Sequence, residues 1–152
     1  MSHPPLSEAL EDAIDGAGTA SAGSDGLTVE ADLSQVGPIG VVVERVKVRG
    51  TPGDITERAA DLEDRLRPDN QPMTAIEVDP RLGGAVLRSP VDRSRRFYEA
   101  EVTEDSVELT RQKVGEDGQR SASDFAVTRE QLGDLVDQIQ ETVAPTADEP
   151  AP

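Results

Sequence analysis

The sequence contains no cysteine, and its single histidine is His3, close to the N-terminus. The absence of cysteine excludes disulfides, thiolate nucleophiles and cysteine-rich zinc sites. A nucleophilic triad needs a base beside its nucleophile, and His3 lies in a stretch that we predict to be a loose tail. We therefore expect no catalytic residue, no metal site and no cofactor.

Aromatic residues are equally scarce, since Phe97, Tyr98 and Phe125 are the only ones. They offer little surface on which nucleic-acid bases could stack. The charge of the chain also argues against nucleic-acid binding. The sequence has 31 acidic and 15 basic residues and a net charge of −16. Such a chain repels phosphate backbones and anionic lipid headgroups. Nucleic acids and membranes are therefore not expected partners.

Long apolar runs are also missing. No stretch approaches the ~18 consecutive apolar residues of a transmembrane helix, and no basic segment precedes a short apolar run as in a signal peptide. We therefore expect a cytoplasmic protein. The arginine-rich, acidic composition fits either a GC-rich genome or a high-salt cytoplasm.

At 152 residues the chain has the length of one domain. Residues 1–26 hold acids but no base and predict a flexible acidic tail with a short amphipathic helix at 6–14. Residues 27–143 predict a single α+β domain. Residues 144–152 are dominated by proline and alanine and predict a disordered C-terminal tail.

The predicted N-terminal helix has one apolar stripe, formed by Leu6, Leu10 and Ile14. A helix this short is marginal by itself in water. It either docks into a groove on a partner protein or remains a frayed tail that contacts its own domain weakly. The Gly/Ala/Ser-rich stretch 16–26 that follows is typical of a flexible linker.

Two strands are predicted at the start of the domain. Apolar residues alternate through 27–33, as in a half-buried strand. Five valines dominate 40–49, where Val41 and Val43 are out of phase with Val46 and Val48. That pattern indicates a strand covered on both faces or one that changes phase at a β-bulge. This strand could also be a sheet edge that pairs between subunits, which would make the protein a homodimer.

Two helices are marked by capping residues. Thr51 is the expected cap of the first, with Pro52 at its first helical position, and Pro68 ends it. Thr128 and Gln131 form a capping box at the start of the second. Each helix carries a single apolar stripe, as a helix laid on a sheet requires.

Between the two helices, turn residues separate five strand-like runs, which predict an antiparallel meander: 73–79, 85–89, 95–103, 106–114 and 120–127. A two-residue turn at Glu104-Asp105 would place Val102 opposite Val107 and Ala100 opposite Leu109. A three-residue loop over 116–118, with Gly118 in the left-handed region, would place Leu109 opposite Phe125 and Val107 opposite Val127.

The predicted fold class is α+β, an antiparallel sheet of five to seven strands in the order β-β-α-β-β-β-β-β-α with two helices packed on one face. In element order it resembles the helix-grip ligand-binding fold, which implies a small-molecule ligand. As a small acidic α+β body it is also similar to type III secretion chaperone-like proteins, which implies a polypeptide partner.

Carboxylates are numerous enough to be considered for catalysis. Glu99 and Glu101 share one strand face at about 6.6–7 Å by strand rise, and the predicted register places Glu108 opposite Glu101. That spacing could imitate a glycosidase pair. The face opposite the apolar residues is predicted to meet solvent, however, so we expect these carboxylates to be hydrated and chemically idle.

Four arginines within nine residues, Arg88, Arg93, Arg95 and Arg96, interrupt the acidic composition. They could bind an acidic peptide or a carboxylate. They could equally pair with neighbouring acids and keep a sheet edge soluble. Together with the apolar stripe at 6–14, these arginines are the candidate partner-binding residues.

The missing catalytic groups and the acidic tails favour a non-catalytic interaction protein, adaptor-like or chaperone-like, that binds a polypeptide. The alternative is a helix-grip-like carrier of a small molecule, with a cavity of roughly 300 Å³ or more between the sheet and the 128–143 helix. A carboxylate-based enzyme would require a buried acid with a raised pKa.

Overall fold

A computed structural model describes residues 6–24 and 26–143 and has an α+β fold. Three α-helices and nine strands follow one another, with a 3₁₀ turn (η1) after the second helix: α1 Leu6–Ala13, β1 Gly18–Ser24, β2 Leu27–Val36, β3 Gly40–Arg49, α2 Ile55–Arg65, η1 Pro68–Asn70, β4 Thr74–Asp79, β5 Gly84–Arg88, β6 Arg96–Thr103, β7 Ser106–Val114, β8 Arg120–Ser123, β9 Phe125–Thr128 and α3 Arg129–Val143. None of the described helices is long and apolar enough to cross a membrane.

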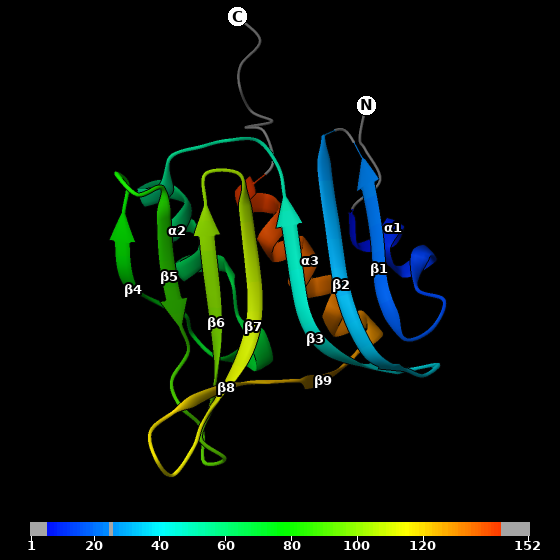
Figure 1. Ribbon diagram of the computed structural model, residues 1–152. Helices are drawn as coiled ribbons and strands as arrows, with labels where there is room; N and C mark the ends of the chain where they lie inside the picture. Colours follow the sequence, from blue (N-terminus) through cyan, green and yellow to red (C-terminus); the bar gives the residue numbers. More distant parts are fainter. Residues whose placement is uncertain (1–5, 25, 144–152) are drawn as a thin grey trace, which may run out of the picture.

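The strands form one antiparallel sheet, larger than the five to seven strands predicted. Seven of them lie in the order β1-β2-β3-β7-β6-β5-β4 (Figure 1). The other two are the halves of one bent strand, because β8 pairs with β7 and β9 pairs with β3. The predicted last strand of the meander therefore continues past β7 and pairs with β3 over its second half.

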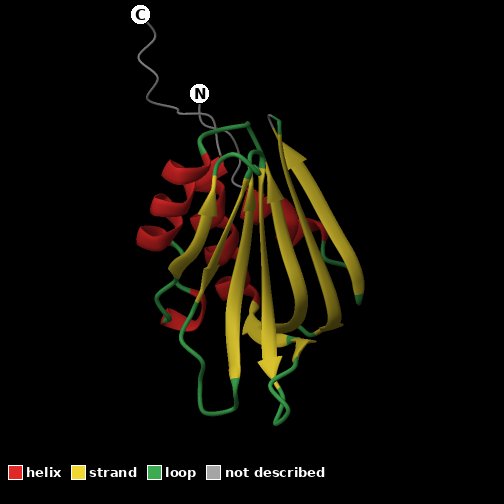
Figure 2. Ribbon diagram, turned by 60° about the vertical axis from the view of Figure 1, so that its left-hand side comes forward, coloured by secondary structure: helices red, strands yellow, loops and turns green. Residues whose placement is uncertain are grey.

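All three helices cover the same face of the sheet (Figure 2). The prediction of two helices on one face is therefore correct for α2 and α3 but omits α1. Leu6 and Leu10 of α1 are 0% and 1% exposed and belong to the same core as the sheet valines. The predicted stripe thus contacts this chain's own core, which explains why so short a helix is stable here.

The stretch 16–26 is not a linker over most of its length. Residues 18–24 form β1, an edge strand paired with β2 in a register that places Ala20 opposite Ala31. Its glycine, alanine and serine side chains give no hydrophobic alternation, so the pairing depends on backbone hydrogen bonds that the sequence pattern does not reveal. The parts of the predicted tails at 1–5, which include His3, and at 144–152 lie outside the described residues, as does residue 25.

Strand β3 changes phase at a bulge, the second of the two predicted alternatives. Asp32 pairs with Arg45 and Leu33 pairs with Val43, so Glu44 is the extra residue. The bulge brings the valines on both sides of it onto the core face. The strand is not an edge, because β2 lies on one side of it and β7 and β9 on the other. Dimerisation through this strand is therefore excluded by its position.

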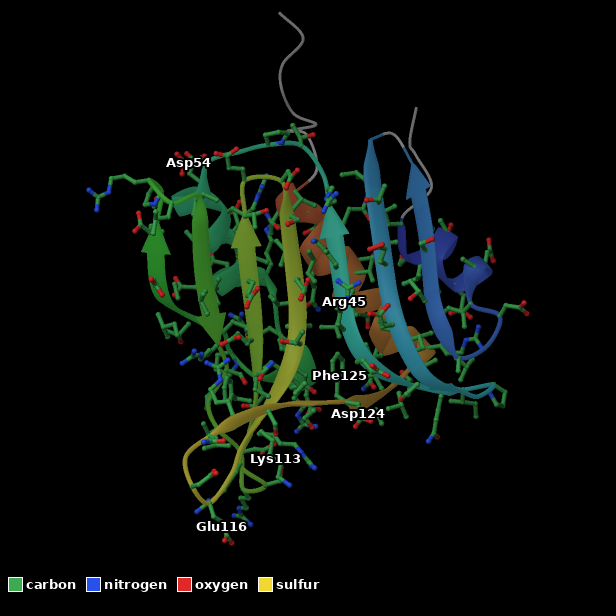
Figure 3. All side chains as sticks on the ribbon, viewed as in Figure 1. Arg45, Asp54, Lys113, Glu116, Asp124 and Phe125 are labelled. Atoms are coloured by element: carbon green, nitrogen blue, oxygen red, sulfur yellow. The ribbon has the colours of Figure 1, made fainter. Side chains whose placement is uncertain are left out.

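The meander follows the predicted register for its central hairpin. Ala100 pairs with Leu109 and Val102 with Val107. The next loop spans 116–118, and Gly118 has a φ of 81°, as predicted. The predicted partner of Phe125 is wrong, because the chain bends at Asp124 and Phe125 pairs with Val43 of β3 (Figure 3).

The helix caps combine one confirmed and one corrected prediction. Thr128 and Gln131 form the expected capping box, with the Gln131 N–H donating to Thr128 Oγ1 over 3.0 Å. The cap of α2 is Asp54 rather than Thr51, since Asp54 Oδ1 accepts a hydrogen bond of 2.9 Å from the Glu57 N–H. Both caps offer a side-chain oxygen to an otherwise unpaired backbone N–H.

Candidate partner-binding site

Figure 1 shows the loop 89–95 and the loop 115–119 side by side at one end of the sheet. Seven basic residues lie on these loops or on the strands next to them. We call this group the arginine tip; it consists of Arg88, Arg93, Arg95, Arg96, Arg111, Lys113 and Arg120. Figure 3 shows nitrogen-bearing side chains around Lys113 in this region. The first four arginines of the tip were predicted from their closeness in sequence.

The other three bases of the tip come from β7 and β8. Strand pairing places Lys113 directly opposite Arg96 and Arg111 opposite Tyr98, while Arg120 pairs with Val114 across the next ladder. These residues were missed because nothing in the local sequence marks them as a cluster. The predicted hairpin register did contain the information, since it fixes which side chains of 95–103 and 106–114 are neighbours.

Asp92 organises the loop that carries the tip. Its Oδ1 accepts hydrogen bonds from the Ser94 N–H (2.8 Å), the Ser94 hydroxyl (2.6 Å) and the Arg96 N–H (3.0 Å). Its Oδ2 accepts a hydrogen bond of 2.7 Å from Arg111 Nη2. These hydrogen bonds, led by that of the Ser94 hydroxyl, lower the pKa of Asp92 to about 2. The carboxylate therefore holds both the turn and Arg111 in place.

Two further arginines of the tip are paired with a buried acid. Glu99 is only 5% exposed, and its Oε2 lies 2.7 Å from Arg88 Nε and 2.8 Å from Arg120 Nη2. Both guanidinium groups also lie over the Phe97 ring, at 5.4 and 5.3 Å from its centroid. Arg88 and Arg120 therefore form a structural ion-pair layer on the outer face of the sheet.

Glu99 is not hydrated, contrary to the prediction for the carboxylates of this sheet face. Its face of the sheet is free of helices, as predicted, but the two arginines and Phe97 shield the group from solvent. Glu101 is exposed, and Glu108 lies 3.2 Å from Arg45 Nη1 on the neighbouring strand. Arg45 also lies 2.7 Å from Asp32, and that hydrogen bond lowers the pKa of Asp32.

Four bases of the tip are left without an ion pair among residues 6–24 and 26–143: Arg93, Arg95, Arg96 and Lys113. Arg96 and Lys113 lie directly opposite each other on paired strands. Two like charges in this position destabilise the strand pair by a few tenths to ~1 kcal/mol. Arg96 Nε is buried and has no hydrogen-bond partner within the same residues. An anion placed beside the two charged side chains would relieve the repulsion between them.

Arg95 is held in an uncommon backbone conformation, with a φ of 63°. Its N–H donates to the Asp92 carbonyl over 3.0 Å, and its own carbonyl accepts a hydrogen bond of 2.8 Å from the Val114 N–H. A left-handed conformation at a residue with a Cβ costs about 1–2 kcal/mol. The side chain is thus exposed at the tip by a turn that glycine would form more easily.

The other predicted partner-binding residues lie elsewhere. Leu6 and Leu10 are buried beneath α3 and β1, and Ile14 is half-buried against the same core. The structure does not bring them near the arginine tip. A groove on a partner protein was one predicted docking site for the apolar stripe of the N-terminal helix. In the structure the stripe packs into the core of this same chain.

A small cavity of about 160 Å³ lies between the sheet and α3. Its polar lining includes Tyr98 and Arg111 of the sheet, Arg67 beside η1, and Gln131 and Gln138 of α3. Burial raises the pKa of the Tyr98 hydroxyl. The Arg111 guanidinium lies 5.1 Å from the Tyr98 ring centroid, which links the cavity to the arginine tip.

Within the described part of the chain, no three histidine or acidic side chains are grouped so that they could hold a metal ion. Comparison of the chain with protein-family models, with curated proteins and with solved structures finds no match. Any function must therefore be argued from the arginine tip and the surfaces around it.

Proposed function

We propose that this protein is a non-catalytic interaction protein, adaptor-like or chaperone-like, whose arginine tip binds an acidic segment of a polypeptide. The observation that carries the proposal is the group of four bases at the tip that form no ion pair with a carboxylate within residues 6–24 and 26–143. In a chain of net charge −16, such a group is unusual. A carboxylate-rich peptide supplies both the charge and the acceptors that these bases need.

The surroundings of the tip support the same proposal. Asp92, Glu99 and the hydrogen bonds of the loop hold the neighbouring backbone in a fixed shape, so little conformational entropy is lost on binding. Val91 is 57% exposed within the same loop and adds an apolar contact. The high negative charge elsewhere on the molecule would steer an acidic partner toward this one end.

Charge reversal at the tip tests the proposal. The variant R93E/R95E/K113E changes three unpaired, exposed bases, and R49E/R65E/R81E makes the same change of net charge at exposed bases away from the tip. A fluorescein-labelled peptide of alternating glutamate and glycine is titrated with each protein, and anisotropy gives the affinity. We expect the tip variant to bind at least about tenfold more weakly than the wild type, because three charge-assisted contacts are lost.

The control variant should bind as the wild type does, apart from a small uniform decrease. Raising the salt concentration should weaken binding to the wild type, since the contacts are exposed ion pairs. Equal losses in the two variants would mean that the peptide senses only net charge. That result, or unchanged binding by the tip variant, would contradict the proposal.

The carrier alternative rests on the cavity between the sheet and α3. Its volume of about 160 Å³ is below the ~300 Å³ at which ligand pockets usually begin. Polar side chains line much of it, so a helix-grip-like carrier of an apolar molecule is the less favoured proposal. The enzyme alternative is weaker still, because both oxygens of the buried Glu99 carboxylate already accept hydrogen bonds from arginine.

A further inference from the structure

A second surface of opposite charge lies on the other layer of the molecule, in the groove between α1 and α3. The two helices lie side by side behind β1–β3 (Figure 1). The open groove between them has a volume of about 530 Å³. Its floor is formed by Ile14, which is half-buried, with Leu10 and Leu132 just beneath.

The rim of this groove is almost entirely acidic. Six carboxylates line it: Glu8, Glu11, Asp12, Glu130, Asp134 and Asp137. The single base in the lining is Arg129, which already pairs with Glu11 at 2.9 Å and donates to the Gly37 carbonyl at 3.1 Å. Five carboxylates of the rim are therefore without a cation among the described residues.

The spacing of these acids creates repulsion within each helix. Glu8 and Asp12 are four residues apart on α1, and Glu130 and Asp134 are four apart on α3. Like charges at this spacing destabilise a helix by about 0.2–0.5 kcal/mol per pair. The two helices also approach closely at Gly133, where an added Cβ would lie 3.5 Å from Ser7 Cβ, so the two acidic faces share one groove.

We propose that the groove between α1 and α3 binds a basic amphipathic helix of a partner protein. An apolar stripe on that helix would contact the Ile14 floor, and its lysines and arginines would pair with the carboxylates of the rim on both sides. Charge complementarity selects this occupant, because an acidic or neutral helix would leave the rim repulsion in place. The proposal is independent of the arginine tip and would give the protein two binding surfaces for segments of opposite charge.

The probe is a synthetic fluorescein-labelled peptide with leucines at helical i, i+3, i+4, i+7 spacing and lysines at the other positions. We expect the wild-type protein to bind it and to raise its helicity in circular dichroism. A scrambled peptide of the same composition should bind at least about tenfold more weakly, because it cannot present leucines and lysines on separate faces. Equal binding of the two peptides would overturn the proposal.

The variant D12K/D134K/D137K removes three exposed carboxylates from the rim. Its matched control, E57K/D64K/E77K, makes the same charge change at exposed positions on α2 and β4. We expect the rim variant to lose at least about tenfold in affinity and the control to stay close to the wild type. Equal losses, or full binding by the rim variant, would overturn the proposal, while R93E/R95E/K113E tests the arginine tip separately and should bind this peptide normally.

Light scattering of the protein alone distinguishes a partner helix from a second copy of this chain. A monomer mass at all concentrations is expected. A mass that rises with concentration and returns to the monomer value in D12K/D134K/D137K would mean that another copy of this chain occupies the groove, which would overturn the assignment to a basic helix.

Discussion

At the scale of single residues, one carboxylate holds the loop of the arginine tip in shape. Asp92 accepts four hydrogen bonds and holds both the 92–96 turn and Arg111. Nothing in the sequence around Asp92 distinguishes it from the 30 other acids of the chain. The hydrogen bonds of a folded loop, rather than a motif, give this residue its role.

The pKa of Asp92 predicts how the loop responds to acid. Because that pKa is lowered to about 2, the carboxylate stabilises the fold fully above pH ~4 and loses its contribution as the pH falls toward 2. We expect D92N to be less stable than the wild type by about 1 kcal/mol at pH 6, with the difference shrinking below pH 4. Urea unfolding at a series of pH values measures it.

The control for this prediction is D64N, which removes an exposed acid that makes no side-chain hydrogen bond within the described residues. It should have nearly the same stability as the wild type at each pH. A constant difference between D92N and the wild type from pH 6 to pH 2 would contradict the role assigned to the Asp92 charge.

Arg95 provides a second test, because its backbone conformation and its charge can be separated. Glycine adopts a φ of 63° without a Cβ penalty, so R95G should stabilise the protein, by on the order of 1 kcal/mol or less, while it weakens binding of the acidic peptide. R93G, at a position whose φ is not positive, should weaken binding without raising stability. A less stable R95G would show that the turn is not strained at this residue.

At the scale of secondary-structure elements, the N-terminal helix is the clearest difference from the sequence prediction. A frayed tail would leave the stability unchanged when its apolar stripe is shortened. In the structure Leu10 is 1% exposed within the main core, so L10A should lower the free energy of unfolding by about 2–5 kcal/mol. L82A, at an 83% exposed side chain, is the control and should change little.

The elements that were predicted correctly are those whose structure is determined by residues close together in the sequence. Pairing of Val102 with Val107 follows from a tight turn and one apolar face, and the left-handed Gly118 follows from the loop length. The capping box at Thr128 is equally local. In these cases a change of register or cap would expose apolar groups or leave backbone donors unpaired.

The elements that were missed depend on partners distant in the sequence. Strand β1 has small side chains and is defined by β2, and the bend at Asp124 follows from Phe125 moving from β7 to β3. The Phe125 ring there meets Tyr98 edge-on at a centroid distance of 5.3 Å. The candidate site shows the same division, because four bases were adjacent in sequence and three were brought in by pairing.

At the scale of the whole molecule, the basic residues are concentrated at one end of the sheet. Exposed acids occur on all three helices and on the sheet and its loops, whereas seven of the 15 basic residues lie at the arginine tip. Asp92 and Glu99 neutralise Arg88, Arg111 and Arg120, so that the remaining bases are those available to a partner. The proposed function rests on these unpaired bases more than on the fold itself.

The most direct test of the account is to map where the acidic peptide binds by titrating it into the isotope-labelled protein and recording backbone amide shifts. The account predicts changes concentrated in residues 91–96 and 111–120, which saturate together and vanish in R93E/R95E/K113E. Shifts centred on α1 and α3, or scattered evenly over the sheet while the arginine tip stays unchanged, would contradict it.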